Sequence, residues 1–231
     1  MPDTCVLAGV GGCVDAVGVL TLGHLFVSHM SGNTASLGAS FGQGQWMQGL
    51  PNLVAVPIFV IGLFLGYYFM VRRPTSRQCA RVLLIEAGLL TVFLAMVMAG
   101  GAAERGWFYF ATITPPVLAM GLQNATLRQI GRSIFPSTYI TGVLDTFAKS
   151  LAQAMTVRDY RKWGKPLPAH LDPDSALLAR RAASVWFCYA GGAILGSAGL
   201  LVFKVGVVVV PICALLILAI RLLREPDEVT S

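Results

Sequence analysis

Charged residues are scarce in this 231-residue chain. Asp, Glu, Lys and Arg make up only 12% of it, about half the share that soluble domains carry. Hydrophobic residues make up 55%, and the mean hydropathy is +0.70. A large soluble domain is therefore excluded, and several apolar runs reach the roughly 18 residues that a bilayer core demands. We predict an all-α polytopic membrane protein with a single transmembrane domain over residues 1–231.

Signatures of metal binding, disulfides and common catalysis are also missing. The chain has no H-E-x-x-H and no C-x-x-C motif, and we expect neither an enzyme nor a cofactor. The cysteines are odd in number, which argues against a disulfide framework. They are Cys5, Cys13, Cys79, Cys188 and Cys213. His24 and His29 are five residues apart, so they do not share a helix face as a metal-binding pair would. The amino terminus lacks the basic region of a signal peptide, and we take the first apolar run as a retained span.

Basic residues gather in three places, which predicts the orientation of the chain. The 72–81 and 158–181 loops and the carboxyl terminus are basic, whereas the 42–49 connection has no positive residue. Basic loops remain in the cytoplasm, so both termini are predicted to be cytoplasmic. The net charge of +6 reports orientation in a membrane and not a nucleic-acid partner.

Apolar runs predict six membrane spans, with two short segments between them. The spans are 5–30, 50–71, 82–100, 107–130, 182–203 and a last one that ends at residues 221–224. The short segments are 32–41 and 141–155. As helices of ten to fifteen residues they would be roughly 15–22 Å long, which reaches only the middle of a core about 30 Å thick. We therefore predict two re-entrant half-helices, one entering from each side.

The two halves of the chain resemble each other. His29-Met30-Ser31-Gly32-Asn33-Thr34 opens the first short segment, and Thr138-Tyr139-Ile140-Thr141-Gly142 opens the second. Asp15-Ala16 precedes the first motif and Asn124-Ala125 the second. We predict an inverted repeat of residues 5–100 and 107–223, with a cytoplasmic loop at 156–181 inside the second copy. Inverted repeats whose broken helices meet near the midplane are a transporter design.

Several of these motifs together resemble the YoaK-like family of small bacterial inner-membrane proteins. The residues that carry the resemblance are Asp15-Ala16, Phe26 to Thr34, Gly121-Leu122-Gln123-Asn124-Ala125 and Thr138 to Gly142. The chain departs from the family in having Ser31 where Thr is more common and in having His29 where Asn or another small polar residue is more common. The resemblance covers nearly the whole chain and implies a multi-spanning protein of the bacterial inner (plasma) membrane, without a settled activity.

The candidate substrate-binding residues lie in the repeated motifs. A carboxylate inside a span needs a cavity or a partner, because its insertion costs at least about 2.5 kcal/mol. Asp15 is thus either a solute or proton site or a buried group that fixes its helix. The first turn of each half-helix has unpaired N–H groups that suit a polar solute or anion, with ordinary capping as the alternative. The predicted set is Asp15, Ser31, Gly32, Asn33, Thr34, Gln123, Asn124, Thr138, Thr141 and Gly142.

The leading hypothesis is a transporter or facilitative channel for a small polar or anionic solute. One alternative is an intramembrane enzyme that acts on a lipid or peptide, which requires Asp15 and Asp145 to share a site. Another is a noncatalytic scaffold or sensor with a packed interior. Small-xxx-small faces at Gly62/Gly66 and Gly192/Gly196 are expected to allow close packing of spans two and five within the chain. Formation of a homodimer is their other use.

Overall fold

The computed structural model is all-helical over the residues that it describes. These are residues 2–72, 75–100, 102, 106–130 and 140–224, without the side chains of 71–72 and 127–130. The helices are α1 (Pro2–Thr21), α2 (Met30–Gly42), α3 (Trp46–Arg72), α4 (Ser76–Met98), α5 (Trp107–Ile130), α6 (Ile140–Lys162), α7 (Ser175–Phe203), the 3-10 helix η1 (Lys204–Val208) and α8 (Val209–Arg224).

Six of these helices coincide with the six apolar runs. Within the described residues, four stretches have the length and apolarity of membrane spans: Pro2–Thr21, Trp46–Met70, Ser76–Met98 and the 50-residue stretch Ser175–Arg224, which holds α7 and α8. Large apolar side chains such as Phe64, Leu195 and Leu201 are exposed on α3 and α7. A surface of this kind is stable in lipid, so the predicted helical membrane protein is confirmed at this level.

Two boundaries differ from the prediction. The first helix ends at Thr21, and the apolar residues up to His29 form a loop that folds back on it. The second short segment is part of α6, which has 23 residues and continues to Lys162. Because the second half of α6 is polar, hydropathy alone missed it. The predicted loop at 156–181 is correspondingly reduced to 163–174, since α7 already begins at Ser175.

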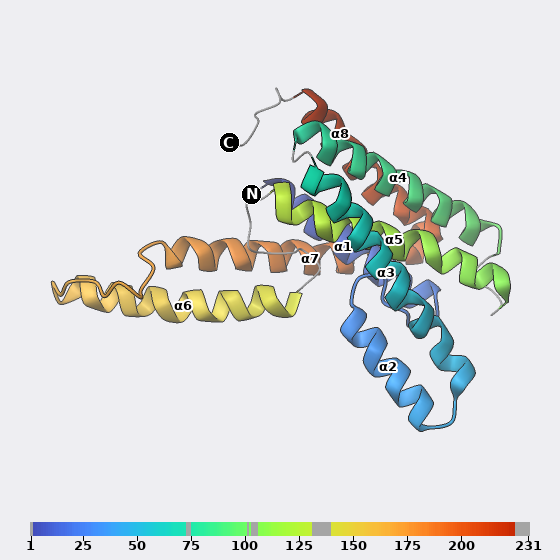
Figure 1. The fold of residues 1–231 in the computed structure, drawn as a ribbon, viewed down its shortest axis with the longest axis horizontal. Coiled ribbons are helices and arrows are strands. Elements are labelled where there is room, and N and C mark those ends of the chain that lie inside the picture. Colours follow the sequence, from blue (N-terminus) through green and yellow to red (C-terminus); the bar gives the residue numbers. More distant parts are fainter. Residues whose placement is uncertain (1, 73–74, 101, 103–105, 131–139, 225–231) are drawn as a thin grey trace.

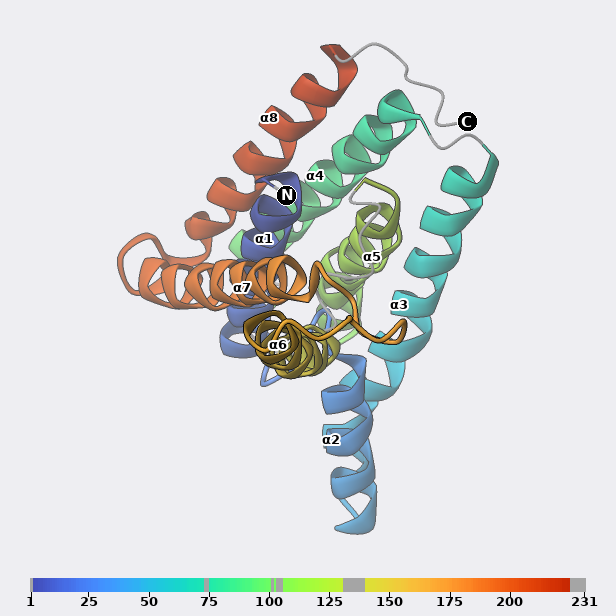
Figure 2. The ribbon, with the colours of Figure 1, turned by 90° about the vertical axis from the view of Figure 1, so that its left-hand side faces the viewer.

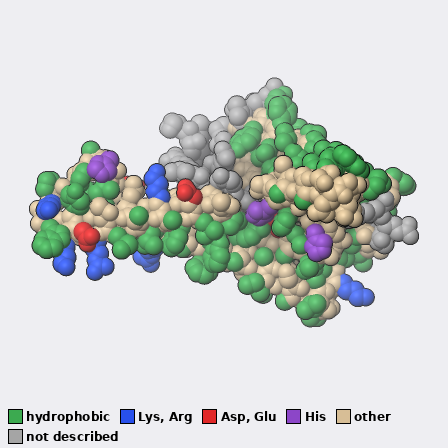
Figure 3. Space-filling view, turned by 90° about the horizontal axis from the view of Figure 1, so that it is seen from below, with side chains coloured by type: hydrophobic (Ala, Val, Ile, Leu, Met, Phe, Trp, Pro, Cys, Tyr) green, Lys and Arg blue, Asp and Glu red, His purple; other side chains and the backbone are tan. Residues whose placement is uncertain are grey.

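Two helical hairpins project from a bundle that surrounds α1. α2 packs along the first part of α3, and α6 packs along the first part of α7. Figures 1 and 2 show these hairpins leaving the bundle in different directions, with the amino-terminal ends of α2 and α6 both near α1. The basic side chains of the α6–α7 hairpin gather at its outer end (Figure 3).

Glycines allow two unusually close helix crossings. On α7, a Cβ on Gly192 would overlap the carbonyl of Gly9 in α1, and a Cβ on Gly196 would lie 2.9 Å from the Cys13 carbonyl oxygen. On α3, a Cβ on Gly62 would lie 2.5 Å from the Leu118 carbonyl oxygen of α5. Both glycine faces therefore pack within the chain, against α1 and α5. The α7 face packs against α1, and the α3 face packs against α5.

The start of α1 and the end of α8 lie at one end of the bundle. The Arg221 guanidinium near the end of α8 donates to the Asp3 carboxylate at the start of α1, over 3.0 Å. Both side chains are at the surface, so this ion pair contributes little stability. The ion pair does show that α1 begins and α8 ends on the same side of the bundle.

Candidate functional site

A loop between α1 and α2 is folded back against the middle of α1. The backbone N–H groups of Val27 and Ser28 donate to Asp15 Oδ1 over 3.0 and 2.9 Å. Asp15 lies six residues before the end of α1, so the loop returns by about 9 Å along the helix axis. The start of α2 is therefore held beside the interior of α1 and not at its end.

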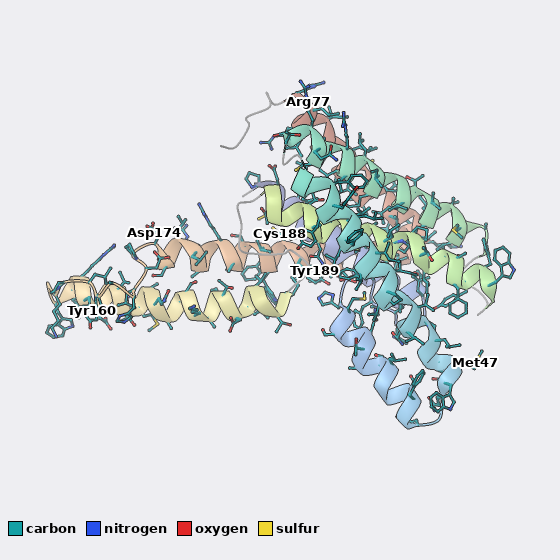
Figure 4. The ribbon with its side chains drawn as sticks, viewed as in Figure 1. Met47, Arg77, Tyr160, Asp174, Cys188 and Tyr189 are labelled. Atoms are coloured by element: carbon teal, nitrogen blue, oxygen red, sulfur yellow. The ribbon has the colours of Figure 1, made fainter. Side chains whose placement is uncertain are left out.

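The second oxygen of the same carboxylate links the loop to α7. Asp15 Oδ2 accepts the Ser28 hydroxyl, lies 2.7 Å from His29 Nδ1 and accepts the Tyr189 hydroxyl over 2.8 Å. The Asp15 side chain is buried, and the His29 side chain is 26% exposed. Figure 4 shows Tyr189 on α7 near the starts of α2 and α6. A carboxylate surrounded by five polar contacts is well suited to the charged form, which explains how α1 tolerates it.

Further hydrogen bonds fix the rest of this loop. The Asn33 side chain accepts from the Phe26 N–H over 3.0 Å and donates to the Phe26 carbonyl over 2.7 Å. At the other end of the loop, the Tyr109 hydroxyl of α5 donates to the Leu22 carbonyl over 2.7 Å. Asn33 is fully buried, and its amide groups are used inside the loop. The loop thus ties α1, α2, α5 and α7 together.

The other predicted residues are distributed more widely. Ser31, Thr34 and Thr141 are exposed, and the Thr34 hydroxyl donates back to the Met30 carbonyl over 2.8 Å. Gly32 lies against the ring of Phe26, 3.2 Å from where its Cβ would be. Gly142 is half-buried in the first turn of α6. Thr138 lies outside the described residues.

Gln123 and Asn124 occupy adjacent positions on α5. Asn124 is half-buried, whereas Gln123 is fully buried and neither polar atom of its amide has a hydrogen-bond partner among the described residues. One cavity, of about 620 Å³, lies between α1, α7 and α8 and is apolar, and another of about 530 Å³ lies between α2 and α3. Thr34 lines the second cavity, but its other walls are aliphatic.

Comparisons with known proteins place the chain in a family. Residues 4–221 match the family described as Protein of unknown function (DUF1275). The chain belongs to this family. It is similar to the UPF0700 transmembrane protein YoaK of Bacillus subtilis, with 25% identity over 167 residues that cover 68% of each chain. It is also similar to the UPF0700 transmembrane protein RA0705 of Rhizobium meliloti, with 30% identity over 152 residues that cover 65% of this chain and 61% of that one. No solved structure matches.

The match confirms the YoaK-like resemblance and, through the printed names, the assignment to a membrane. It adds no activity, because both relatives are described only as transmembrane proteins. The family as matched begins near the start of α1 and ends within α8. Both hairpins and the Asp15 cluster therefore lie inside the matched region.

The four residues bonded to Asp15 were not among the predicted site residues: Val27, Ser28, His29 and Tyr189. Three of them lie at the start of the first motif or just before it, whereas Tyr189 was not singled out. A tyrosine hydroxyl within the apolar run 182–203 is a weak signal by itself. It becomes informative only once α7 is known to cross α1 at Gly12, where a Cβ would overlap the Tyr189 carbonyl.

The two aspartates required by the enzyme hypothesis are in different surroundings. Asp15 is buried and bonded to the loop and to Tyr189, whereas Asp145 is exposed on α6. Within the described residues, no group of three or more His, Cys, Asp or Glu side chains converges as a metal site would. The arrangement around Asp15 is suited to holding a loop, because its carboxylate makes polar contacts with the loop and with Tyr189.

The loop should respond to pH through His29. Burial lowers the pKa of His29, but the hydrogen bond and the charge of Asp15 raise it, and the net pKa lies above the usual 6.5. The stabilisation by protonated His29 is then complete below that usual value and is lost as pH rises through the raised pKa. We therefore expect thermal stability in detergent to fall as pH rises from about 6.5 through the raised pKa of His29. His29→Gln should flatten this part of the profile.

The control for this titration is His24→Gln. His24 is exposed, with a positive φ of 66° in the turn after α1, and its replacement should leave the pH profile unchanged. A profile that keeps its slope in His29→Gln would show that another group titrates.

Proposed function

We propose that the protein is a transporter or facilitative channel for a small polar solute in the bacterial inner membrane, with both termini in the cytoplasm. The observation that supports this most is the Asp15 cluster. A buried carboxylate inside the bundle binds a returning loop of the first half of the chain and Tyr189 of the second half. Ionisable residues at such depth in a span mark solute or proton routes more often than they serve packing.

An inverted repeat is the second part of the proposal. Gly192 and Gly196 follow Gly62 and Gly66 by the same interval of 130 residues, and each pair sits at a close helix crossing. The crossings are equivalent in detail: a Cβ on Gly12 would meet Tyr189 and Ala193, and a Cβ on Gly121 would meet their counterparts Phe59 and Leu63. These contacts support two copies of one unit, residues 5–100 and 107–223.

The starts of the two short segments support the same symmetry. Met30, the first residue of α2, and Ile140, the first described residue of α6, are matching positions of the aligned motifs. Asn33 and Val143, three residues into each helix, are both fully buried. The amino-terminal ends of both helices lie beside α1 (Figures 1 and 2). We propose that α2 and the first part of α6 enter the membrane from opposite sides, and that the solute passes between their starts.

Charge narrows the solute class. The Asp15 carboxylate already places a negative charge beside the start of α2, where it accepts the backbone N–H groups of Val27 and Ser28. A second negative charge beside it would be repelled. A neutral polar or cationic solute therefore fits this side better than the anionic solute that the sequence alone allowed.

The conformation described here is closed on the Asp15 side. Val27 and Ser28 are buried against α1, and the loop would have to leave Asp15 to open a path. Competition by water or solute for the Asp15 hydrogen bonds would release the loop from α7 at the same time, because one carboxylate holds both. Transport would then proceed by movement of the α1–α2 loop and not of a whole domain.

Purified protein in liposomes tests the proposal. Swelling in gradients of glycerol, urea, glycine and ammonium chloride, followed by light scattering, should be faster than in empty liposomes for at least one solute. Gly32→Leu should return that rate to the rate of empty liposomes, because its side chain would press on Phe26 and fill the start of α2. Gly38→Leu is the matched control on the same helix, since a Cβ there meets nothing within 4 Å.

A packed interior favours one other candidate, a noncatalytic membrane sensor. The Asp15 cluster is enclosed, and the two large cavities lie elsewhere. If no solute of the panel enters faster than in empty liposomes while the His29 titration is present, the sensor replaces the transporter. Equal rates in the wild type and Gly32→Leu would leave transport but move the site away from α2.

A further inference from the structure

A second buried acid lies on α4, away from the Asp15 cluster. Glu86 is fully buried, and neither oxygen of its carboxyl group has a hydrogen-bond partner among the described residues. It occupies one position of the buried stripe of α4, which otherwise consists of apolar and small side chains such as Val82, Leu83 and Leu90. Packing alone would favour a leucine here, because an unpartnered buried polar group costs about 1–3 kcal/mol and a charged one more.

Nothing described around Glu86 compensates a negative charge. α4 packs on α5 and α8 and also contacts η1 and α3. The basic residue of η1 is Lys204, which is exposed. The basic groups of α4 are Arg77 and Arg81 near its cytoplasmic start, and Arg81 is exposed with a weak bond to Gln78. α5 has no ionisable side chain other than Tyr109 over its described side chains, residues 107–126, and the basic groups of α8 are Arg221 and Arg224 in its last turn. Arg221 pairs with Asp3.

The burial of Glu86 also limits what can neutralise it. Each carboxyl oxygen has less than 1 Å² of accessible surface, so a water-sized sphere does not reach it. A hydrated or bare metal cation would need several oxygen ligands, and the described residues offer none. A proton needs neither space nor further ligands.

We propose that Glu86 is a proton-binding site, whose carboxyl group carries a proton in this conformation and releases it when α4 moves away from α5 or α8 and water enters. Gln123 of α5 is also fully buried, and neither polar atom of its amide has a hydrogen-bond partner among the described residues. It lies seven residues from the end of α5, and Glu86 ten residues from the start of the antiparallel α4, so they are at depths of about 10 and 15 Å from the same end. The Gln123 amide is therefore placed to exchange a hydrogen bond with the Glu86 carboxyl group when the helices shift.

The proposal assigns the two buried acids opposite roles. Asp15, with five polar contacts, suits the carboxylate, and Glu86, with none, suits the neutral acid. Two acids whose surroundings favour different protonation states are a common arrangement for proton transfer. Coupling of this proton to solute movement rests on the proposed transport function, whereas the protonation of Glu86 does not.

Infrared spectroscopy of the full-length protein tests the protonation directly. At neutral pH, the wild type should show the carbonyl band of a carboxylic acid without hydrogen bonds. Glu86→Gln should lose this band, while Asp3→Asn, which changes a paired surface carboxylate, should retain it. A band that is absent from the wild type, or that persists in Glu86→Gln, overturns the proposal.

The stability of a Glu86 variant tests independently whether the carboxyl group lacks a partner. Glu86→Leu should be at least as stable as the wild type in detergent, because it removes an unpartnered group from an apolar stripe. A clear loss of stability would reveal a partner for Glu86 and overturn the premise. In liposomes that transport a solute, an imposed pH gradient should drive accumulation in the wild type and not in Glu86→Gln. Accumulation that persists in Glu86→Gln would show that this proton is not coupled to transport. Absence of all transport would contradict the proposed function. The infrared result does not depend on either outcome.

Discussion

Asp15→Ala should destabilise the protein by about 3–5 kcal/mol, the usual cost of removing one partner of a buried, charged network. Without the carboxylate, the N–H groups of Val27 and Ser28 and the hydroxyl of Tyr189 lose their acceptor in a buried place. His29 loses its ion-pair partner as well. We expect a lower free energy of unfolding in mixed detergent and a loop that becomes accessible to thiol reagents at a cysteine introduced at Val27.

Asp15→Asn tests the roles of the two carboxylate oxygens separately. The Asn oxygen can still accept from Val27 and Ser28, but its N–H₂ group would face the Tyr189 hydroxyl and His29 Nδ1, which donate to Oδ2. The loss should be intermediate, and solute flux should fall with it. Asp3→Asn is the control, because an exposed ion pair is worth about 0–1 kcal/mol. Equal stability of Asp15→Ala and Asp3→Asn would show that the loop does not depend on the carboxylate.

Much of the helical framework could be predicted because bilayer thickness sets the length of apolar runs. The helix over Trp107–Ile130 coincides with its predicted span, and the start of α2 falls at the predicted motif. Hydropathy misled where a helix leaves the apolar pattern, as at α6, which continues to Lys162. It also misled after Thr21, where apolar residues form a loop whose backbone groups are satisfied by the side chains of Asp15 and Asn33.

The site could be predicted only in part. A carboxylate in the first span had to have a cavity or a partner, and the motif that begins at His29 marked the start of the first short segment. The structure pairs these two features. Tyr189 could not be found in this way, because it lies 174 residues from Asp15 and a single hydroxyl in an apolar run has many other uses. The approach of α7 to α1 decides its role, and that depends on packing over the whole bundle.

Among single Gly→Ala substitutions, Gly192→Ala should lower the stability of the protein most. Its Cβ would overlap the backbone of Gly9, and a backbone atom cannot move aside as the end of a side chain can. Overpacking of a tight interface costs about 1–3 kcal/mol and occasionally more, and we expect the upper part of this range because α1 and α7 would have to separate. The same separation would pull Tyr189 from Asp15, so the melting temperature and the His29 titration should change together.

Gly191→Ala is the matched control one residue away. A Cβ on Gly191 meets nothing within 4 Å, and replacing a helical Gly by Ala adds helix propensity of up to about 1 kcal/mol. The melting temperature of Gly191→Ala should therefore stay equal or rise.

The equivalent change on α3, Gly62→Ala, should also lower stability, because its Cβ would lie 2.5 Å from the Leu118 carbonyl oxygen. If the halves are an inverted repeat, Gly62→Ala should cost stability without altering the His29 titration. At the α3–α5 crossing, Asn124 and Phe59 occupy the positions that correspond to Asp15 and Tyr189, and neither is ionisable. A change in that titration in Gly62→Ala would instead mean that the two crossings move as one.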